Sequence, residues 1–214
     1  MAVEVKICGL TRPEDALAAA ERGAAYLGVV LASGPRVVPP ALVAEIVAAA
    51  RGVRVLGVFG SQPVAEILDI AAATGLAGAQ LHGDYRREDA SRLHAAGLEV
   101  WRVVRIAALP DLDRLEEATK DADAVLVEPR VAHAAGGTGV SLDLAVAREA
   151  RGRLSGFRMV LAGGLTAENV AGTVALVRPD VVDVSSGVEH LPGIKDPIKI
   201  AAFLEAVLGP SAIS

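Results

Sequence analysis

Two kinds of segment, strand-like and helix-like, alternate along the sequence, and this alternation constrains the fold more than any other feature. Short runs rich in Val, Ile and Leu are each followed by a longer Ala-, Leu-, Glu- and Arg-rich stretch with helical spacing. The expected strands are residues 3–8, 26–31, 53–59, 78–81, 99–105, 124–128, 158–162 and 181–185. The expected helices are residues 13–22, 40–50, 64–74, 86–96, 111–119, 142–151, 167–177 and 197–208.

Eight strand–helix pairs of about 27 residues each fit a closed parallel barrel. We therefore predict an α/β fold, a (β/α)8 TIM barrel, with residues 1–214 forming a single catalytic domain. The rival fold is an open doubly wound sheet, which usually needs fewer units and binds its ligand where the strand order reverses. No low-complexity linker divides the chain.

The composition of the chain argues against several classes of binding partner. Aromatic residues are only 3% of a chain that is 52% hydrophobic, so aliphatic side chains must build the core, which suits parallel strands covered on both faces. The net charge of −5, with both signs interspersed, predicts no nucleic-acid partner and no membrane partner. A single cysteine excludes an intrachain disulfide and a thiolate metal site, and the opening residues lack a signal-peptide pattern. We expect a cytoplasmic protein without a metal.

Two helix starts carry capping signals. Thr11 stands before Pro13 and three residues before Glu14, which predicts a threonine N-cap. Thr166 precedes the stretch that begins at residue 167 and predicts a second polar start.

Polar and ionisable residues follow the expected strands at their carboxyl ends. In a barrel of this kind those ends carry the active site, whereas the strand interiors here are apolar. The candidates are Cys8, Arg36, Gln80, His82, Glu128 and Asp183.

Taken singly, three of these candidates have an ordinary structural alternative. Cys8 could be a small buried hydrophobic residue, or a base if its pKa fell modestly from about 8.5. His82, taken alone, is more typical of a structural residue than of a functional one. Arg36 could be a solvated loop residue or a clamp for a carboxylate or phosphate.

Glycine and serine turns follow the seventh and eighth expected strands. Glycines let the backbone approach a phosphate closely, and the loops after these two strands are where barrels of this class often bind one. The alternative is a pair of ordinary tight turns, but the coincidence of both turns favours phosphate. The predicted phosphate-binding residues are Gly163, Gly164, Ser185, Ser186 and Gly187.

A third glycine-rich segment, residues 136–139, lacks the Gly-Lys-Ser/Thr ending of a P-loop. It is either a flexible active-site loop after the sixth strand or a plain surface loop.

Several segments, in order along nearly the whole chain, resemble the phosphoribosylanthranilate isomerase family of tryptophan biosynthesis. The matching segments are Lys-Ile-Cys-Gly-Leu-Thr at 6–11, Gln-Leu-His-Gly at 80–83, Gly-Gly-Thr-Gly at 136–139, Leu-Ala-Gly-Gly-Leu at 161–165, Asp-Val-Ser-Ser-Gly-Val-Glu at 183–189 and Pro-Gly-Ile-Lys-Asp at 192–196. The first and the fifth are the most specific when found together.

The resemblance implies an Amadori rearrangement of N-(5-phosphoribosyl)anthranilate to 1-(2-carboxyphenylamino)-1-deoxyribulose 5-phosphate. It implies a small phosphorylated substrate and no cofactor or metal. Cys8 would be the base that removes the C2 proton, and the carboxyl group after the sixth strand would protonate the ribose ring oxygen. The implied substrate-binding residues are Arg36 at the anthranilate carboxylate, Gln80 and His82 at the pocket wall, and Asp183 near the phosphate turns.

The chain departs from the family pattern in three places. Glu128 stands where the family has an aspartate, one methylene shorter. The loop after the second strand is about one residue shorter and lacks the usual lysine. Residues 140–144 lack the lysine and the two aromatic residues that usually follow the glycines.

Two alternative functions stay open at this point. A bifunctional isomerase that also serves histidine biosynthesis would need a second phosphate turn after the third or fourth strand, and none is evident. A sugar-phosphate-binding barrel without catalysis would keep the phosphate turns and lose the acid–base pair. The chain is expected to be a monomer or a homodimer.

Overall fold

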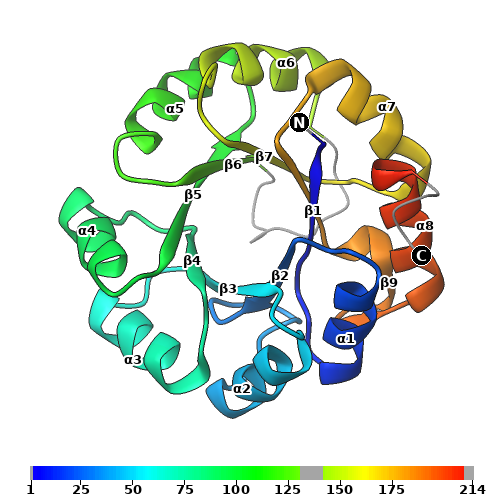
Figure 1. Ribbon diagram of the computed structural model, residues 1–214. Coiled ribbons are helices and arrows are strands. Elements are labelled where there is room, and N and C mark those ends of the chain that lie inside the picture. Colours follow the sequence, from blue (N-terminus) through cyan, green and yellow to red (C-terminus); the bar gives the residue numbers. More distant parts are fainter. Residues whose placement is uncertain (1, 131–141, 210–214) are drawn as a thin grey trace.

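Eight parallel strands form a closed barrel within the described part of the chain, residues 2–130 and 142–209 of this computed structural model (Figure 1). Each strand pairs with its neighbours in sequence, and β1 closes the ring by pairing with β8. The strands are β1 Glu4–Ile7, β2 Tyr26–Val30, β3 Arg54–Phe59, β4 Gly78–Leu81, β5 Glu99–Ile106, β6 Ala124–Pro129, β7 Met159–Ala162 and β8 Val181–Val184. The predicted TIM barrel is confirmed, and the open doubly wound sheet is excluded.

Helices surround the barrel as an outer ring, one after each strand (Figure 1). They are α1 Pro13–Glu21, α2 Pro40–Ala49, α3 Val64–Thr74, α4 Arg87–Ala95, α5 Asp113–Ala118, α6 Leu144–Arg153, α7 Ala167–Val177 and α8 Pro197–Leu208. The stretch expected as one helix from residue 111 begins instead with the 3-10 helix η1, Leu109–Leu112. Asp111 shapes this turn, because its carboxylate accepts hydrogen bonds from the backbone N–H groups of Ala107 and Ala108.

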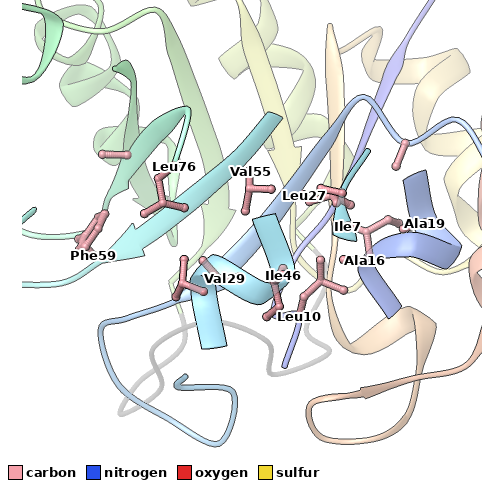
Figure 2. Packing of buried hydrophobic residues seen from close by; sticks show 14 of the residues in the cluster. Ile7, Leu10, Ala16, Ala19, Leu27, Val29, Ile46, Val55, Phe59 and Leu76 are labelled. Carbon is pink, nitrogen blue, oxygen red and sulfur yellow. The ribbon is translucent and has the colours of Figure 1, made fainter. Parts of the chain in front are cut away.

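Alternate residues of each strand face opposite sides of the barrel wall. Outward residues such as Ile7, Leu27 and Val29 pack against α1 and α2, as Figure 2 shows, and belong to a continuous layer between strands and helices. Ile46 of α2 and Ala16 of α1 meet them from the helix side. This aliphatic layer explains how a chain with few aromatic residues builds a core.

Inward residues fill the lower part of the barrel with a separate apolar cluster. Tyr26 and Trp101 meet edge to face there, with ring centroids 4.8 Å apart. Above this cluster the inward positions become polar, beginning with Lys6, whose Nζ atom lies 5.7 Å from the centroid of the Trp101 ring. Apolar side chains thus fill the lower part of the barrel, and polar side chains occupy its upper part.

One capping prediction is wrong and the other is confirmed. Arg12, not Thr11, is the residue before α1, because the helix starts at Pro13. The Thr11 hydroxyl instead donates a hydrogen bond to the carbonyl of Gly193, so it ties the first loop to the last. Thr166 is the N-cap of α7, where Asn169 accepts a hydrogen bond from the Thr166 N–H.

A small antiparallel pair that the sequence patterns did not predict follows β8. It consists of β9 Glu189–Leu191 and β10 Ile194–Lys195, preceded by a 3-10 turn, η2 Ser186–Val188. The glycine-rich segment 136–139 lies outside the described residues. None of the described helices is long and apolar enough to cross a membrane.

Candidate active site

A cavity of about 670 Å³ opens at the carboxyl ends of the strands. Its lining includes every residue that the sequence analysis selected for catalysis, substrate binding or phosphate binding. The selected residues that line it are Cys8, Arg36, Gln80, His82, Glu128, Gly163, Gly164, Asp183, Ser185, Ser186 and Gly187. One cavity therefore brings together residues from across the chain.

Cys8 lies directly after β1 and is 8% exposed. Its N–H donates to the carbonyl of Val184, which fixes the end of β1 against β8. Burial raises the pKa of the Cys8 thiol, and the nearby Lys6 ammonium opposes that rise. The thiol faces a position on β2 where Gly28 has no side chain; a Cβ atom there would lie 2.8 Å from Cys8 Sγ.

A buried charged pair lies beneath the thiol. Lys6 Nζ lies 3.1 Å from Asp183 Oδ1 and donates a second hydrogen bond of 2.9 Å to Gln80 Oε1. Lys6 and Asp183 are register partners on β1 and β8, so the barrel itself sets them side by side. Burial lowers the pKa of Lys6, but the charges of Asp183 and Cys8 outweigh burial and raise it overall.

Glu128 ends β6 and reaches the cavity from the opposite wall. Its Oε1 atom accepts a hydrogen bond of 2.8 Å from Arg105 Nε on β5 and lies 3.6 Å from His82 Nδ1. Only 8% of Glu128 is exposed. The carboxyl group of Glu128 therefore lies within the cavity, where Arg105 holds it.

His82 is a neutral imidazole in this setting. Burial lowers its pKa to about 3, and the positive charges of Arg105 and Lys6 add to the effect. Its two ring nitrogens lie 2.8 Å from Gln80 Nε2 and 3.0 Å from Arg105 Nη2. A neutral ring has only one acceptor nitrogen, so it can accept from one of these donors at a time.

Arg36 extends across the end of β1 from the loop after β2. Its Nε and Nη2 atoms each donate a hydrogen bond of 2.7 Å to the carboxylate of Glu189. The side chain passes over Gly9, where a Cβ atom would lie 2.5 Å from Arg36 Cδ. Gly9 also has a φ of +73°, so both its conformation and its missing side chain are needed for this pose.

Lys195 completes a second buried charge cluster. Its Nζ atom donates to Glu189 Oε1 at 2.8 Å and to the carbonyl of Ser185 at 3.0 Å. Burial would raise the pKa of Glu189, but the hydrogen bonds and charges of Arg36 and Lys195 outweigh it and lower that pKa. Two basic groups thus surround one carboxylate, although burial lowers the pKa of Lys195.

The loops after β7 and β8 touch each other at the cavity rim. Gly187 approaches the carbonyl of Leu165 so closely that a Cβ atom would lie 2.0 Å from its oxygen. Gly163 and Gly164 have φ values of 102° and 63°, and Asn169 Nδ2 donates to the Gly164 carbonyl. These are the backbone features that a close approach to an anion requires.

Sequence reasoning missed four charged residues of this site. The missed residues are Lys6, Arg105, Glu189 and Lys195. Strand periodicity could have found two of them, because Lys6 shares a strand face with Cys8, and Arg105 occupies an inward position of β5. Asp123, a second carboxylate near β6, is exposed at the opposite end of that strand and accepts a hydrogen bond from the Val100 N–H.

Within residues 2–130 and 142–209, no group of three or more His, Cys, Asp and Glu side chains is arranged to hold a metal ion.

Known proteins resemble this chain over nearly its full length. Residues 5–206 match the family model described as N-(5'phosphoribosyl)anthranilate (PRA) isomerase. A relative from Pseudomonas paraeruginosa, N-(5'-phosphoribosyl)anthranilate isomerase, is 40% identical over 96% of this chain and 95% of its own.

Solved structures agree with the sequence matches. Phosphoribosyl anthranilate isomerase from Thermus thermophilus superposes with a TM-score of 0.85 at 33% identity, covering 96% of this chain and 98% of its own. A phosphoribosyl anthranilate isomerase in complex with reduced 1-(o-carboxyphenylamino)-1-deoxyribulose 5-phosphate superposes with a TM-score of 0.82 at 34% identity. The match covers 97% of this chain and 99% of that chain. This chain belongs to the N-(5'-phosphoribosyl)anthranilate isomerase family.

Proposed function

We propose that this protein is an isomerase that converts N-(5-phosphoribosyl)anthranilate to 1-(2-carboxyphenylamino)-1-deoxyribulose 5-phosphate in tryptophan biosynthesis. The observation that carries the proposal is one cavity lined by a thiol, a carboxyl group and two glycine-rich loops. Family membership supports the same conclusion.

Glu128 is the proposed acid. Its protonated carboxyl group gives a proton to the ribose ring oxygen, the C1–O bond breaks, and the nitrogen lone pair forms a Schiff base. The carboxylate that remains receives the Arg105 hydrogen bond of 2.8 Å. Stabilising the conjugate base in this way favours the proton transfer.

Cys8 is the proposed base. Its thiolate takes the C2 proton of the Schiff base, and the electron pair of the broken C–H bond forms the enolamine. The enolamine becomes the ketone when C1 takes up a proton and the C2 hydroxyl loses one. Burial raises the pKa of Cys8, so the positive charges around it are needed for this role.

The two ends of the substrate bind to opposite sides of the thiol in this proposal. The loops that contain Gly163, Gly164 and Gly187 receive the phosphate, and Arg36 receives the anthranilate carboxylate. Glu189 uses the Nε edge of Arg36, which leaves further N–H donors of the fork for that carboxylate.

The first experiment measures turnover of freshly prepared phosphoribosylanthranilate by its fluorescence in wild type, Glu128→Ala and Glu128→Asp, with the exposed Glu205→Ala as matched control. We expect wild type and Glu205→Ala to turn over alike and Glu128→Ala to lose about 10²- to 10⁴-fold in kcat. Absence of turnover in wild type, with activity appearing in Glu128→Asp, would show a binding protein with a displaced acid.

A second variant separates binding from chemistry. Cys8→Ser removes the thiolate with a minimal change of shape, so it should bind the reduced product analogue with nearly wild-type affinity while turnover disappears. Full activity in Cys8→Ser would exclude Cys8 as the base.

A cytoplasmic location and the choice between monomer and homodimer stay predictions from the sequence. Light scattering on the purified chain decides between the two assemblies.

A further inference from the structure

Lys6 is the most deeply buried charged residue in the barrel interior. Its side chain is 0% exposed and lies between the Trp101 ring below and the cavity floor above. A lysine without solvent is expensive unless its charge is compensated. Two of its three ammonium donors are used, by Gln80 Oε1 at 2.9 Å and Asp183 Oδ1 at 3.1 Å.

The same ammonium lies next to the Cys8 sulphur. Residues 6 and 8 face the same side of the barrel wall, because the side-chain period of a strand is two. A Cβ atom at Gly28 would lie 3.1 Å from Lys6 Nζ and 2.8 Å from Cys8 Sγ, so both atoms border one small space. Gly28 keeps that space free of any side chain between them.

The charges facing Cys8 come from four elements. Lys6 on β1 and Lys195 on β10 favour the thiolate, and Asp183 on β8 opposes it. Arg36, from the loop after β2, also interacts with the Cys8 charge and is itself paired with Glu189. Lys6 is the strongest of the groups that favour the thiolate.

We propose that Lys6 is a positioning residue for the reaction: its buried ammonium stabilises the thiolate form of Cys8 against the effect of burial and holds Gln80 and Asp183 beside it. This inference deepens the proposed function and rests on Cys8 acting as the base. Lys6 itself is not among the residues that line the cavity. It acts through the electrostatic free energy of the thiolate.

The single cysteine makes a direct test possible, because any thiol reagent that reaches the chain reports Cys8 alone. The rate of alkylation by iodoacetamide is measured from pH 5 to pH 11 by mass spectrometry in wild type and Lys6→Met. We expect the midpoint of the rate curve to rise by about one to three pH units in Lys6→Met, the usual effect of one opposite charge at this range. An unchanged midpoint would overturn the proposal.

Two further variants keep the test decisive. Lys120→Met removes an exposed lysine of the outer ring and should leave the midpoint unchanged. Lys6→Gln removes the ammonium charge and can still hydrogen-bond to Asp183, so its midpoint should rise as in Lys6→Met. If Lys6→Met does not fold, an unchanged midpoint in Lys6→Gln overturns the proposal by itself.

Activity measurements then separate this inference from the proposed function. If Cys8 is the base, the low-pH limb of kcat/KM in Lys6→Met moves upward by the same amount as the alkylation midpoint. A shifted alkylation curve with an unshifted rate profile would retain the effect of Lys6 on the thiol and remove Cys8 from the mechanism. An unshifted alkylation curve in an active enzyme would reject Lys6 and retain the isomerase.

Discussion

Arg36 donates two hydrogen bonds of 2.7 Å to the Glu189 carboxylate, one from Nε and one from Nη2. A guanidinium held along one edge cannot rotate, so its remaining donors point in a fixed direction. Glu189 is therefore a structural support for the anion-binding end of the site.

Substitution Glu189→Gln should weaken substrate binding more than chemistry. Because the bidentate pair is lost, Arg36 becomes mobile, and we expect KM to rise about tenfold, equivalent to about 1.4 kcal/mol, with little change in kcat. Steady-state kinetics measure the split, with Glu205→Gln as the exposed control. A fall in kcat at constant KM would mean that Glu189 serves the chemical step.

The neutral state of His82 should make stability depend on pH. Its pKa is lowered to about 3 in the folded protein, so the unfolded chain binds one more proton between about pH 6.5 and pH 3. The stabilisation is complete above pH 6.5 and is lost as pH falls through that window, by about 1.4 kcal/mol per unit.

Urea denaturation at pH 7 and pH 5 checks this dependence. The loss of unfolding free energy between the two pH values should be about 1 to 2 kcal/mol smaller in His82→Gln than in wild type. The exposed His190→Gln should behave as wild type. Equal losses in all three proteins would show that His82 is already protonated at pH 5.

Gly28→Ala should impair the reaction without a large loss of stability. The new methyl group would lie 2.8 Å from Cys8 Sγ and would displace the sulphur. A displacement of about 1 Å can cost about 10²-fold in rate, and we expect a fall of that order in kcat/KM. Thermal unfolding run in parallel shows whether the barrel stays intact; unchanged kcat/KM would mean that the sulphur has room to move.

Gly187→Ala should weaken phosphate binding and destabilise the fold. Its Cβ atom would lie 2.0 Å from the Leu165 oxygen, so the loops after β7 and β8 must separate. Isothermal calorimetry with inorganic phosphate should show at least tenfold weaker binding. In Gly172→Ala, where a Cβ atom on α7 meets nothing within 4 Å, we expect unchanged phosphate binding and a gain of up to about 1 kcal/mol in stability.

The strand–helix alternation predicted the barrel because each period is a local property of the chain. Strand ends are predictable for the same reason, so the sequence alone indicates that Cys8, Gln80 and Glu128 lie at the same end of the barrel. Lys6 was missed because a lysine in a strand usually faces solvent. Its two-residue spacing from Cys8 was the one local signal, and its pairing with Asp183 appears only where β1 closes the ring on β8. Sequence patterns could not reveal the role of Glu189, because its partner Arg36 is 153 residues away along the chain.

For Thr11 the local sequence leads to a wrong prediction rather than none. Its local context favours a helix cap, but a tertiary contact with Gly193 takes the hydroxyl. Local patterns therefore predicted the scaffold and the positions of the site, whereas the pairing of buried charges required the assembled barrel.

The row of contacts from Lys6 through Gln80 and His82 to Arg105 begins and ends with a cation that can only donate. His82 lies between two donors, Gln80 Nε2 and Arg105 Nη2, but its neutral ring has a single lone pair that can accept a hydrogen bond. One of the two N–H groups therefore has no acceptor on the ring. An oxygen atom of water, or of a ligand that enters the cavity, can supply that acceptor without breaking a hydrogen bond of the row. A hydrocarbon of the same shape would leave that N–H group without an acceptor, so the row of donors disfavours apolar ligands at this point of the cavity.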